Sequence, residues 1–355
     1  MSGQHEAFEA EVAGAGGGGG MIGVDGGPAV DVKARGYWEQ VWLRFKQDRI
    51  AIIGGIFIFV LVFTAFVGGP IASRILGHGP NEIFANGVDV NTLQPVGPFT
   101  TISAAPFPTP AGTKGFEDTF LILGADGQLG RDMFLRILYG AQTSLEVAVL
   151  ATLFAVSVGV LLGLLAGYFR GGVDTVVSRL TEIAMAFPVL LFIIAVSATV
   201  GPQLNGITFG FLAPGVFTLT LIFGLFGWFY PARIIRGQVL SLREKEFIEA
   251  ARMTGAGDWR IMRSHLLPHL VAPIIVYSTL IVAGNIVAEA GLSFLGLGIQ
   301  APTASWGNLL SAGPDYYLTQ PWLMVWPGLM ILLTTLAFNL LGDGLRDAFD
   351  PRHTT

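Results

Sequence analysis

Long uncharged runs of apolar residues, separated by shorter charged segments, dominate this chain. A bilayer core about 30 Å thick needs about 20 apolar residues for each helix that crosses it. The block from 183 to 232 is too long for one such helix, and the breakers Gly201-Pro202 and Asn205-Gly206 divide it into two. The pattern therefore predicts an all-α membrane protein with six transmembrane helices, at roughly 50–69, 145–168, 180–200, 214–234, 270–292 and 322–342.

The distribution of Lys and Arg predicts the orientation of these spans. With the N-terminus inside, the inner segments carry sixteen of the twenty basic residues, and the other four fall in one long outer loop. Cytoplasmic segments of membrane proteins carry an excess of Lys and Arg. The sequence therefore predicts that the N-terminus and the C-terminus are both cytoplasmic.

The spans divide the chain into segments of different character. Before the first span, Trp38, Val41, Trp42 and Phe45 share one helical face, which is typical of a helix lying in the membrane interface. The predicted segments are a flexible Gly-rich cytoplasmic tail (1–35), this interfacial amphipathic helix (36–49), the first transmembrane helix (50–69), a long Pro-rich extracytoplasmic loop (70–130, with Pro106, Pro108 and Pro110 among its prolines), a transmembrane domain (131–348) containing a cytoplasmic loop at 236–268, and a C-terminal tail (349–355).

Composition narrows the possible classes of protein. Only 13% of the residues are charged, against about 25% in soluble domains, so an ordinary soluble enzyme is excluded. The net charge is −5 and no basic block is present, which gives no indication of a nucleic-acid partner. The chain has no cysteine, so it contains no disulfide, no thiolate nucleophile and no Cys-ligated metal.

No pattern of catalytic residues is found. None of the four lysines directly follows a glycine, which excludes a P-loop. His265 and His269 have a metal-ligand spacing, but Pro268 lies between them, and we interpret them as structural or interfacial. Ser293 in Gly291-Leu292-Ser293 resembles the nucleophile of an intramembrane protease, but no histidine base is predicted at its depth. We therefore predict no catalytic residue and no metal site in this chain.

Three acids, Glu146, Glu182 and Glu289, lie at or within the edges of predicted spans. A charge at membrane depth costs roughly 2.5–3.5 kcal/mol on insertion scales, so each acid needs an explanation. Glu289 is the most central, and it could line a translocation path together with Asn285, one helical turn earlier. A buried glutamate hydrogen-bonded to a neighbouring helix is an equally good interpretation.

The most informative cytoplasmic stretch runs from 241 to 268. Good helix formers fill 241–253, and Ser241 followed by Glu244 has the spacing of a capping box. Gly255 and Gly257 are expected to end this helix, and Asp258 is expected to start a second short helix that ends at Pro268. The sequence thus predicts two short helices joined by a glycine turn.

Several motifs in this stretch and beyond it resemble those of a known family. Glu249-Ala250-Ala251, Gly255 and Leu267-Pro268 resemble the EAA loop of ABC-importer permeases, and His265 is common in the peptide-importer branch. Three further stretches resemble the second permease subunit of dipeptide and oligopeptide importers. They are LGRD at 129–132 with Tyr139-Gly140 and 143–145, EAGLSFLGLG at 289–298 with SWGN at 305–308, and NLLGDGLRD at 339–347 with Asp350-Pro351. The resemblance spans about 129–352, and the Gly-rich tail and the Pro-rich loop depart from it.

The resemblance implies a type I importer half-channel in a bacterial or archaeal cell membrane. Its partners would be a homologous second permease subunit, two cytoplasmic ATPase subunits, an extracytoplasmic substrate-binding protein and membrane lipid. The chain would bind no cofactor itself, because ATP would bind to the ATPases. The coupling residues would be Glu249, Ala250, Ala251, Gly255, Leu267 and Pro268.

Two other classes of protein and several kinds of cargo are compatible with the sequence. A gradient-driven secondary transporter would act without an ATPase, and it usually shows internal repeats or broken helices with buried ion ligands. A membrane-embedded hydrolase is disfavoured by the missing base. Dipeptides, longer peptides, nickel and other small cargo all remain compatible with the motifs.

Overall fold

The computed structural model describes residues 36–102, 118–204 and 212–350. The predicted tail at 1–35, the prolines Pro106, Pro108 and Pro110, the breaker Asn205-Gly206 and residues 351–355 lie outside these ranges. The chain divides into two units, 1–40 and 41–355.

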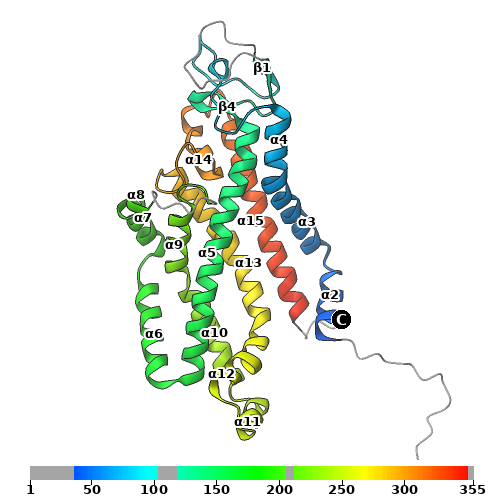
Figure 1. The fold of residues 1–355 in the computed structure, drawn as a ribbon, viewed down its shortest axis with the longest axis vertical. Helices are drawn as coiled ribbons and strands as arrows, with labels where there is room; N and C mark the ends of the chain where they lie inside the picture. The colour runs from blue at the N-terminus through cyan, green and yellow to red at the C-terminus, as the bar shows by residue number, and fades with distance from the viewer. Residues whose placement is uncertain (1–35, 103–117, 205–211, 351–355) are drawn as a thin grey trace, which may run out of the picture. The chain divides into compact units, whose positions relative to one another are not determined.

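Helices account for most of the described residues (Figure 1). The α-helices are α2 (Tyr37–Phe45), α3 (Arg49–Phe63), α4 (Gly69–Leu76), α5 (Met133–Phe169), α6 (Gly171–Ala186), α7 (Val189–Thr199), α8 (Gly201–Leu204), α9 (Val216–Gly227), α10 (Phe229–Leu242), α11 (Glu246–Met253), α12 (Asp258–Ile261), α13 (Leu267–Phe294), α14 (Trp306–Ser311) and α15 (Trp322–Phe349). Two π-helical turns, Thr64–Gly68 and Met262–Leu266, join α3 to α4 and α12 to α13. Short 3-10 turns lie at Ala85–Gly87, Gly127–Leu129 and Gly313–Asp315.

Among the described residues, five continuous helices are long and apolar enough to cross a membrane. They are Arg49–Leu76, Met133–Phe169, Val216–Leu242, Asp258–Phe294 and Trp322–Phe349. A sixth span requires α6 and α7 to be taken together, and these two helices meet at 83°. The prediction of one continuous third span at 180–200 is therefore wrong. The bend falls at Phe187-Pro188, where the proline ring disfavours helical geometry in the residue before it.

The helices extend well beyond the apolar windows that predicted them. The first continues to Leu76, so the loop expected from residue 70 begins later, and α5 begins at Met133 rather than near 145. The prediction that Pro268 ends a short helix is wrong. The chain continues through a π-turn into α13, and Pro268 lies in the first turn of that helix. A proline is tolerated there because the first turn of a helix leaves its N–H groups unpaired.

Helix α5 packs against α10, α9 and α13 (Figure 1). Gly159, Gly163 and Gly167 form one stripe along it, facing α10. A Cβ atom on Gly163 would lie 2.5 Å from the carbonyl oxygen of Ala232, and one on Gly167 would lie 2.7 Å from Cβ of Val239. Small residues at four-residue spacing let two helix backbones approach closely, which explains the tight α5–α10 contact.

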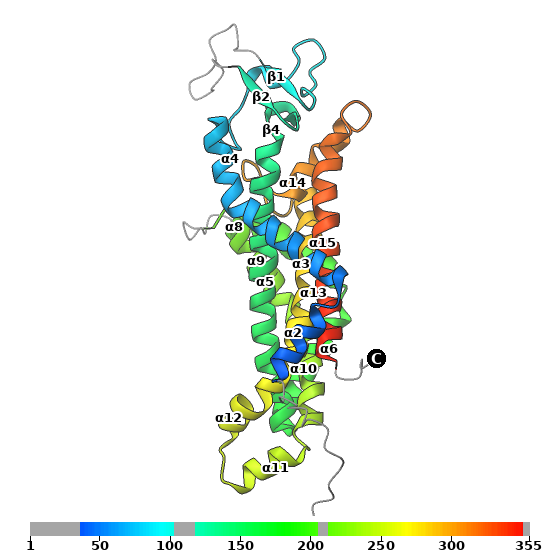
Figure 2. The same cartoon turned by 90° about the vertical axis from the view of Figure 1, so that its right-hand side faces the viewer.

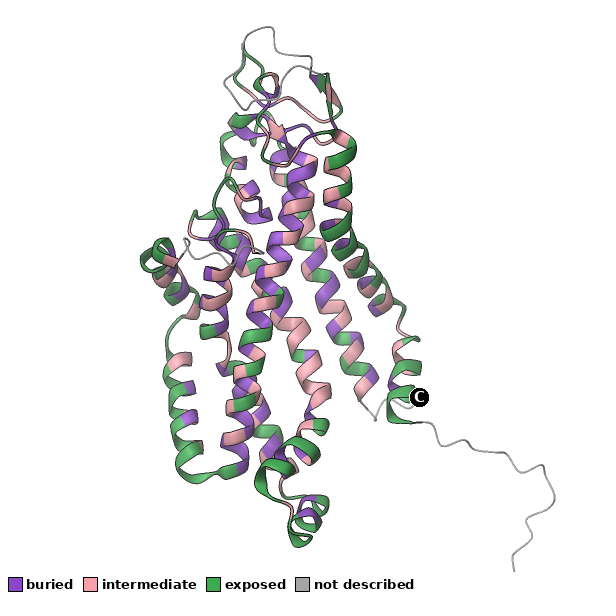
Figure 3. Ribbon diagram, viewed as in Figure 1, coloured by how far each residue is buried: buried purple, intermediate pink, exposed green. Residues whose placement is uncertain are grey.

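The remaining long helices complete this unit around α5. Helix α13 packs against α15, and α15 packs against α3, which crosses obliquely in Figure 2. The core near the N-terminal end of α5 is built around Trp306, whose indole Nε1 donates to the carbonyl of Ile137 at 3.2 Å. The outward face of α3 is exposed in Figure 3, and its exposed residues after Arg49 are apolar, as a lipid-facing surface requires.

The segment between α4 and α5 carries two small antiparallel sheets. Strand β1 (Thr100–Ile102) pairs with β2 (Thr119–Leu121), and β3 (Ala125–Asp126) pairs with β4 (Arg131–Asp132). Asp132 then caps α5, because its Oδ1 accepts from the backbone N–H groups of Phe134 and Leu135 at 2.8 and 3.2 Å.

Buried ion pairs hold this segment to the N-terminal end of α5. Asp126 pairs with both Arg131 and Arg136, and Arg136 also donates to the side chain of Asn81 at 2.9 Å. Nε2 of His78 lies 2.9 Å from Oδ2 of Asp132, with both side chains almost fully buried. Burial alone would lower the pKa of His78, but the hydrogen bond and charge of Asp132 raise it above its ordinary value.

Candidate functional site

The short helix α11 lies at the C-terminal end of α5, between the spans that contain α10 and α13 (Figures 1 and 2). Ile248 and Ala251 face inward and are buried among residues from α5, α10 and α13. Glu249, Ala250 and Met253 are exposed, and Met253 reaches 83% exposure. The helix is therefore anchored by one face and leaves the other face open, with a flat Ala250 beside a long apolar methionine.

Gly255 ends α11 in a conformation that other residues resist. Its φ is +81°, its N–H donates to the carbonyl of Arg252 at 2.9 Å, and the N–H of Ala256 reaches the carbonyl of Ala251 at 3.0 Å. This pair of bonds is a Schellman motif with glycine in the left-handed position. Space around Gly255 is open, so the backbone angle rather than crowding demands glycine.

The start of this loop differs from the sequence prediction. Ser241 lies inside α10 rather than at a helix N-cap, and α11 begins after Lys245 without a side-chain cap. Glu244 instead forms an exposed ion pair with Arg170, across the end of α5. The capping-box interpretation was wrong because α10 continues through Ser241 to Leu242.

Three contacts of aromatic side chains join the loop to the long helices. The hydroxyl of Tyr168, at the end of α5, donates to Oδ1 of Asp258 at 2.6 Å. The ring of Phe247 stacks on His269 of α13, with ring centroids 4.9 Å apart and planes at 16°. The guanidinium of Arg252 lies 5.6 Å from the centre of the Tyr168 ring. These contacts link α11 and α12 to both α5 and α13.

The predicted residues Leu267 and Pro268 mark the joint at which the loop becomes a span. They form the first turn of α13, directly after the π-turn at Met262–Leu266. Nearby, Trp259 of α12 is 63% exposed, which is unusual for so large an apolar side chain. Sequence reasoning did not single out Tyr168, Phe247 or Trp259. The aromatic residues flanking the motif were the available signal.

The predicted path residue Glu289 lies in a closed hydrogen-bond cluster. It is fully buried, and it accepts from the hydroxyls of Ser144 and Ser293, each at 2.7 Å. Ser144 belongs to α5, so the cluster joins α5 to α13. These contacts agree with the interpretation of Glu289 as a buried glutamate that is hydrogen-bonded to a neighbouring helix.

Asn285 lies one turn from Glu289 and is partly buried. Its side-chain nitrogen donates to Oγ1 of Thr152 on α5 at 3.0 Å. Asn285 and Glu289 thus contact α5 at successive turns. The SWGN motif adjoins this cluster, since Ser305 and Asn308 form a reciprocal capping box at the start of α14.

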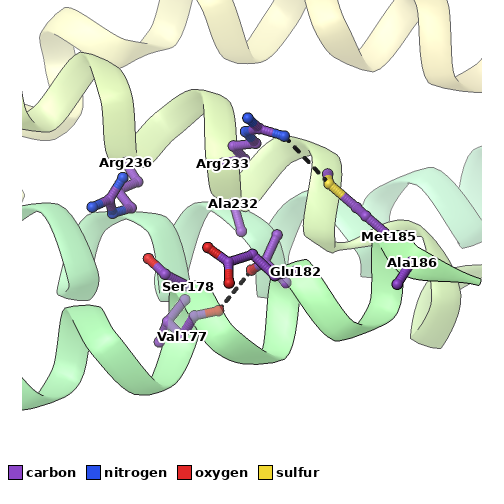
Figure 4. Close-up of a pocket in the computed structure, with 9 residues that line it drawn as sticks. Val177, Ser178, Glu182, Met185, Ala186, Ala232, Arg233 and Arg236 are labelled. Carbon is purple, nitrogen blue, oxygen red and sulfur yellow. Dashed lines mark hydrogen bonds between the residues drawn. The ribbon is translucent and has the colours of Figure 1, made fainter.

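A cavity of about 370 Å³ separates α6 from α10 (Figure 4). Its charges are largely compensated, because Arg236 pairs with Asp174 at 2.9 Å and Glu182 pairs with Arg179 at 2.7 Å. Nη1 of Arg233 lies 3.7 Å from Sδ of Met185. Glu182, the second acid marked in the sequence, is thereby an exposed surface partner.

The described ranges hold no group of three or more His, Asp or Glu side chains suited to a metal ion. Nδ1 of His269 lies 2.7 Å from the carbonyl oxygen of His265, and the ring of His269 is stacked on Phe247. The ring of His269 therefore serves local structure.

Two family models match the chain. Residues 159–355 match the model for the binding-protein-dependent transport system inner membrane component. Residues 36–95 match the model for the N-terminal transmembrane domain of oligopeptide transport permease C.

Three curated relatives resemble the chain over nearly its full length. The glutathione transport system permease protein GsiD of Pectobacterium atrosepticum is 35% identical over 91% of this chain and 93% of its own length. The dipeptide transport system permease proteins DppC of Alkalihalophilus pseudofirmus and Bacillus subtilis are 36% and 37% identical, each over 89% of this chain. These matches cover 90% and 86% of the two relatives.

One solved structure is also similar. The MetNI methionine ABC transporter in inward-facing conformations aligns with 61% of this chain and 98% of its own chain, with a TM-score of 0.47 at 19% identity. That likeness is too weak to carry a structural argument.

Proposed function

Because this chain belongs to the family of binding-protein-dependent transport system inner membrane components, we propose that it forms half of the path of an ATP-driven peptide importer. The same family membership favours this function over a gradient-driven secondary transporter. The named relatives act on dipeptides and glutathione, which supports a short peptide as cargo.

The observation that carries this proposal is the two-sided construction of α11. One face is buried against α5, α10 and α13, while Glu249, Ala250 and Met253 are open to a partner. Met253 and Trp259, at 83% and 63% exposure, leave two large apolar side chains of this loop uncovered, which supports a surface that another protein covers. Beside the resemblance to the EAA loop, this supports α11 as the helix that seats on an ATPase.

In this mechanism α11 acts as a short rigid lever. Nucleotide binding on the ATPases moves α11, and the contacts of Tyr168 with Asp258 and of Phe247 with His269 carry the movement to α5 and α13. The path then opens to one side of the membrane at a time, as in domain rearrangements between packed bistable states. Leu267 and Pro268 lie at the joint where loop movement becomes helix movement.

The proposal assigns the remaining roles to partners. Two ATPase subunits would bind and hydrolyse ATP, a homologous second permease would complete the path, and a binding protein would deliver cargo from outside. This chain would bind no cofactor itself. The loop with β1 to β4 would face the binding protein, which requires both chain ends to be cytoplasmic.

The coupling role is tested by Gly255→Leu and Glu249→Arg in the reconstituted transporter. Leucine at φ +81° costs roughly 1–2 kcal/mol and distorts the end of α11, whereas arginine reverses the charge of its exposed face. We expect ATP hydrolysis to continue while peptide uptake falls about tenfold or more, a change of roughly 1.4 kcal/mol. Gly257→Ser is the matched control, because Gly257 has φ −70° and stands at an N-cap that suits serine.

Wild-type uptake in both coupling variants would reject the lever. The absence of an ATPase from a purified complex that still moves peptide down an ion gradient would reject the importer itself.

The orientation is tested with single cysteines, since the chain has none of its own. Met253→Cys and Val90→Cys both replace highly exposed side chains. An impermeant maleimide added to intact cells should label the cysteine at position 90, and label the one at 253 only after the membrane is opened and the ATPases are stripped from it. The reverse order would place α11 outside, where no cytoplasmic ATPase could reach it.

A further inference from the structure

Glu146 is the third acid at a span edge, after the hydroxyl-bonded Glu289 and the ion-paired Glu182. It stands on α5, thirteen residues after Met133, which is about 20 Å along a helix. No Asp, Glu, Lys or Arg occurs between Glu146 and Arg170, so its carboxylate lies at the boundary of the apolar stretch. An ionisable group at that depth marks a ligand path more often than a packing role.

The hydrogen bonding of this carboxylate is incomplete. Nε2 of Gln142 donates to Oε1 of Glu146 at 3.1 Å, and the side chain is only partly buried. Within the described part of the chain, no Lys, Arg or His forms an ion pair with it. Glu289, in contrast, is fully buried and has a serine hydroxyl on each oxygen.

Glu146 lines a cavity of about 330 Å³. The described lining comes from four separate segments: the loop after α4, helix α5, the residues before α9 and the loop after α13. Asn81, Tyr139, Gln142 and Thr303 are among the polar members of the described lining, in which Glu146 is the one charged residue. The volume falls at the lower end of the range for small-ligand pockets, about 300–1,000 Å³.

The charge and the donor set of this cavity select a class of ligand. A single carboxylate in an otherwise neutral polar lining attracts a monovalent cation. Divalent metals are less suitable, since Ca²⁺ takes about 6–8 oxygen ligands, usually with several carboxylates. A primary ammonium carries one positive charge and three N–H donors, which match one carboxylate and nearby amide and hydroxyl oxygens.

We propose that this cavity binds the N-terminal ammonium group of a transported peptide, with Glu146 as the charged contact. The proposal rests on the proposed function for its ligand. Because the cavity lies at the Met133 end of α5, it would receive the peptide on the side opposite α11. It would orient the peptide amino end first as the path opens.

The first test measures the charge preference of the cavity without any transport. Thr303→Cys is introduced into this cysteine-free chain in the complete transporter, and labelling of this chain is followed by mass spectrometry. We compare the rates for a trimethylammonium and a sulfonate methanethiosulfonate reagent. Adding Glu146→Gln should lower the cation-to-anion rate ratio about tenfold, at the low end of electrostatic steering in clefts.

The matched control is Glu182→Gln, which removes a different carboxylate at a span edge. Glu182 is exposed and paired with Arg179, and it does not line this cavity. The rate ratio should be unchanged in this control.

The second test identifies the ligand. Dialanine should slow labelling of Thr303→Cys, whereas N-acetyl-dialanine, which lacks the ammonium group, should not. Glu146→Gln should abolish the protection. Equal protection by both compounds, or a rate ratio unaffected by Glu146→Gln, would overturn the proposal. An unreactive cysteine at 303, alongside a reactive one at Val90, would mean that another subunit fills the cavity and would also overturn it.

Failure of this site and failure of the importer are distinguishable. Neither labelling test needs ATP, so an intact ammonium site in a complex that imports no peptide would reject the proposed function alone. Normal ATP-driven uptake with no protection by dialanine would reject the site alone.

Discussion

At the Met133 end of α5, Arg136 is 1% exposed and is held by Asp126, Asn81 and the carbonyl of Pro302. At the Phe169 end, the charges of α11 are exposed and Met253 and Trp259 are open to solvent. The charge of Arg136 is paired within this chain, whereas the apolar side chains of Met253 and Trp259 are left uncovered. A buried charge with a partner in the same chain stabilises the fold, whereas uncovered apolar side chains are typical of a surface that another protein covers.

The largest effect is expected from removing a buried charge at the Met133 end of α5. Asp126→Asn leaves Arg136 buried without its carboxylate, a change that typically costs roughly 3–5 kcal/mol. We expect a large fall in the thermal unfolding midpoint of the purified protein and poor recovery from membranes. Glu182→Gln removes an exposed pair as the control, and its cost should stay within about 1 kcal/mol. Equal stability of the two variants would show that the buried pair contributes little.

Variants at the Phe169 end of α5 should instead leave stability nearly unchanged and weaken the binding of a partner. Trp259→Ala and Met253→Ala remove exposed side chains, so stability should hardly change. Binding of the ATPases to permease-containing nanodiscs should weaken by more than 1 kcal/mol, about fivefold or more in Kd, if these residues are contact hot spots. Ile248→Ala is the complementary variant, because this buried residue should cost roughly 2–5 kcal/mol of folding stability. Unchanged ATPase affinity in both exposed variants would remove them from the interface.

The smallest expected effect is a pH dependence of stability that comes from His78. The pKa of His78 is raised in the folded state, since Asp132 and the carbonyl of Leu76 outweigh the effect of burial. The folded protein therefore holds this proton more tightly than the unfolded chain. The stabilisation is fully present below the unfolded pKa of about 6.5 and is lost as pH rises through the folded value.

We expect the unfolding midpoint to fall as pH rises across this window, and the fall should be smaller in His78→Gln. Hydrogen exchange at the start of α5 should report the same trend. A His78→Gln protein with an unchanged pH profile would assign the dependence to another group.

Much of the helical layout could be predicted because a membrane span has a simple signature. Five of the six spans correspond to continuous helices, and the EAA-like stretch lies in the loop between the fourth and fifth, as expected. The bend between α6 and α7 was missed, although Pro188 gave a local signal for it. Helix ends were placed too early or too late because hydropathy measures the apolar part of a helix, whereas hydrogen bonding sets its length.

The site was predictable where its reason is local. Gly255 is required by its own φ, and the sequence pattern located it. The contacts of Tyr168 with Asp258 and of Ser144 with Glu289 join residues 90 and 145 positions apart. No periodicity or motif spacing indicates such pairs, since they depend on how separate helices pack.

The sequence by itself determined that this chain lies in the membrane, that it belongs with the importer permeases, and which stretch resembles a coupling loop. These properties follow from composition, from apolar run length and from short motifs, each of which acts over neighbouring residues. Only the tertiary structure decided which acids have hydrogen-bond partners on a neighbouring helix and which line a cavity. The electrostatic environment of Glu146 and Glu289 is set by partners from distant segments, and the free energy of a charge in the membrane depends on those partners.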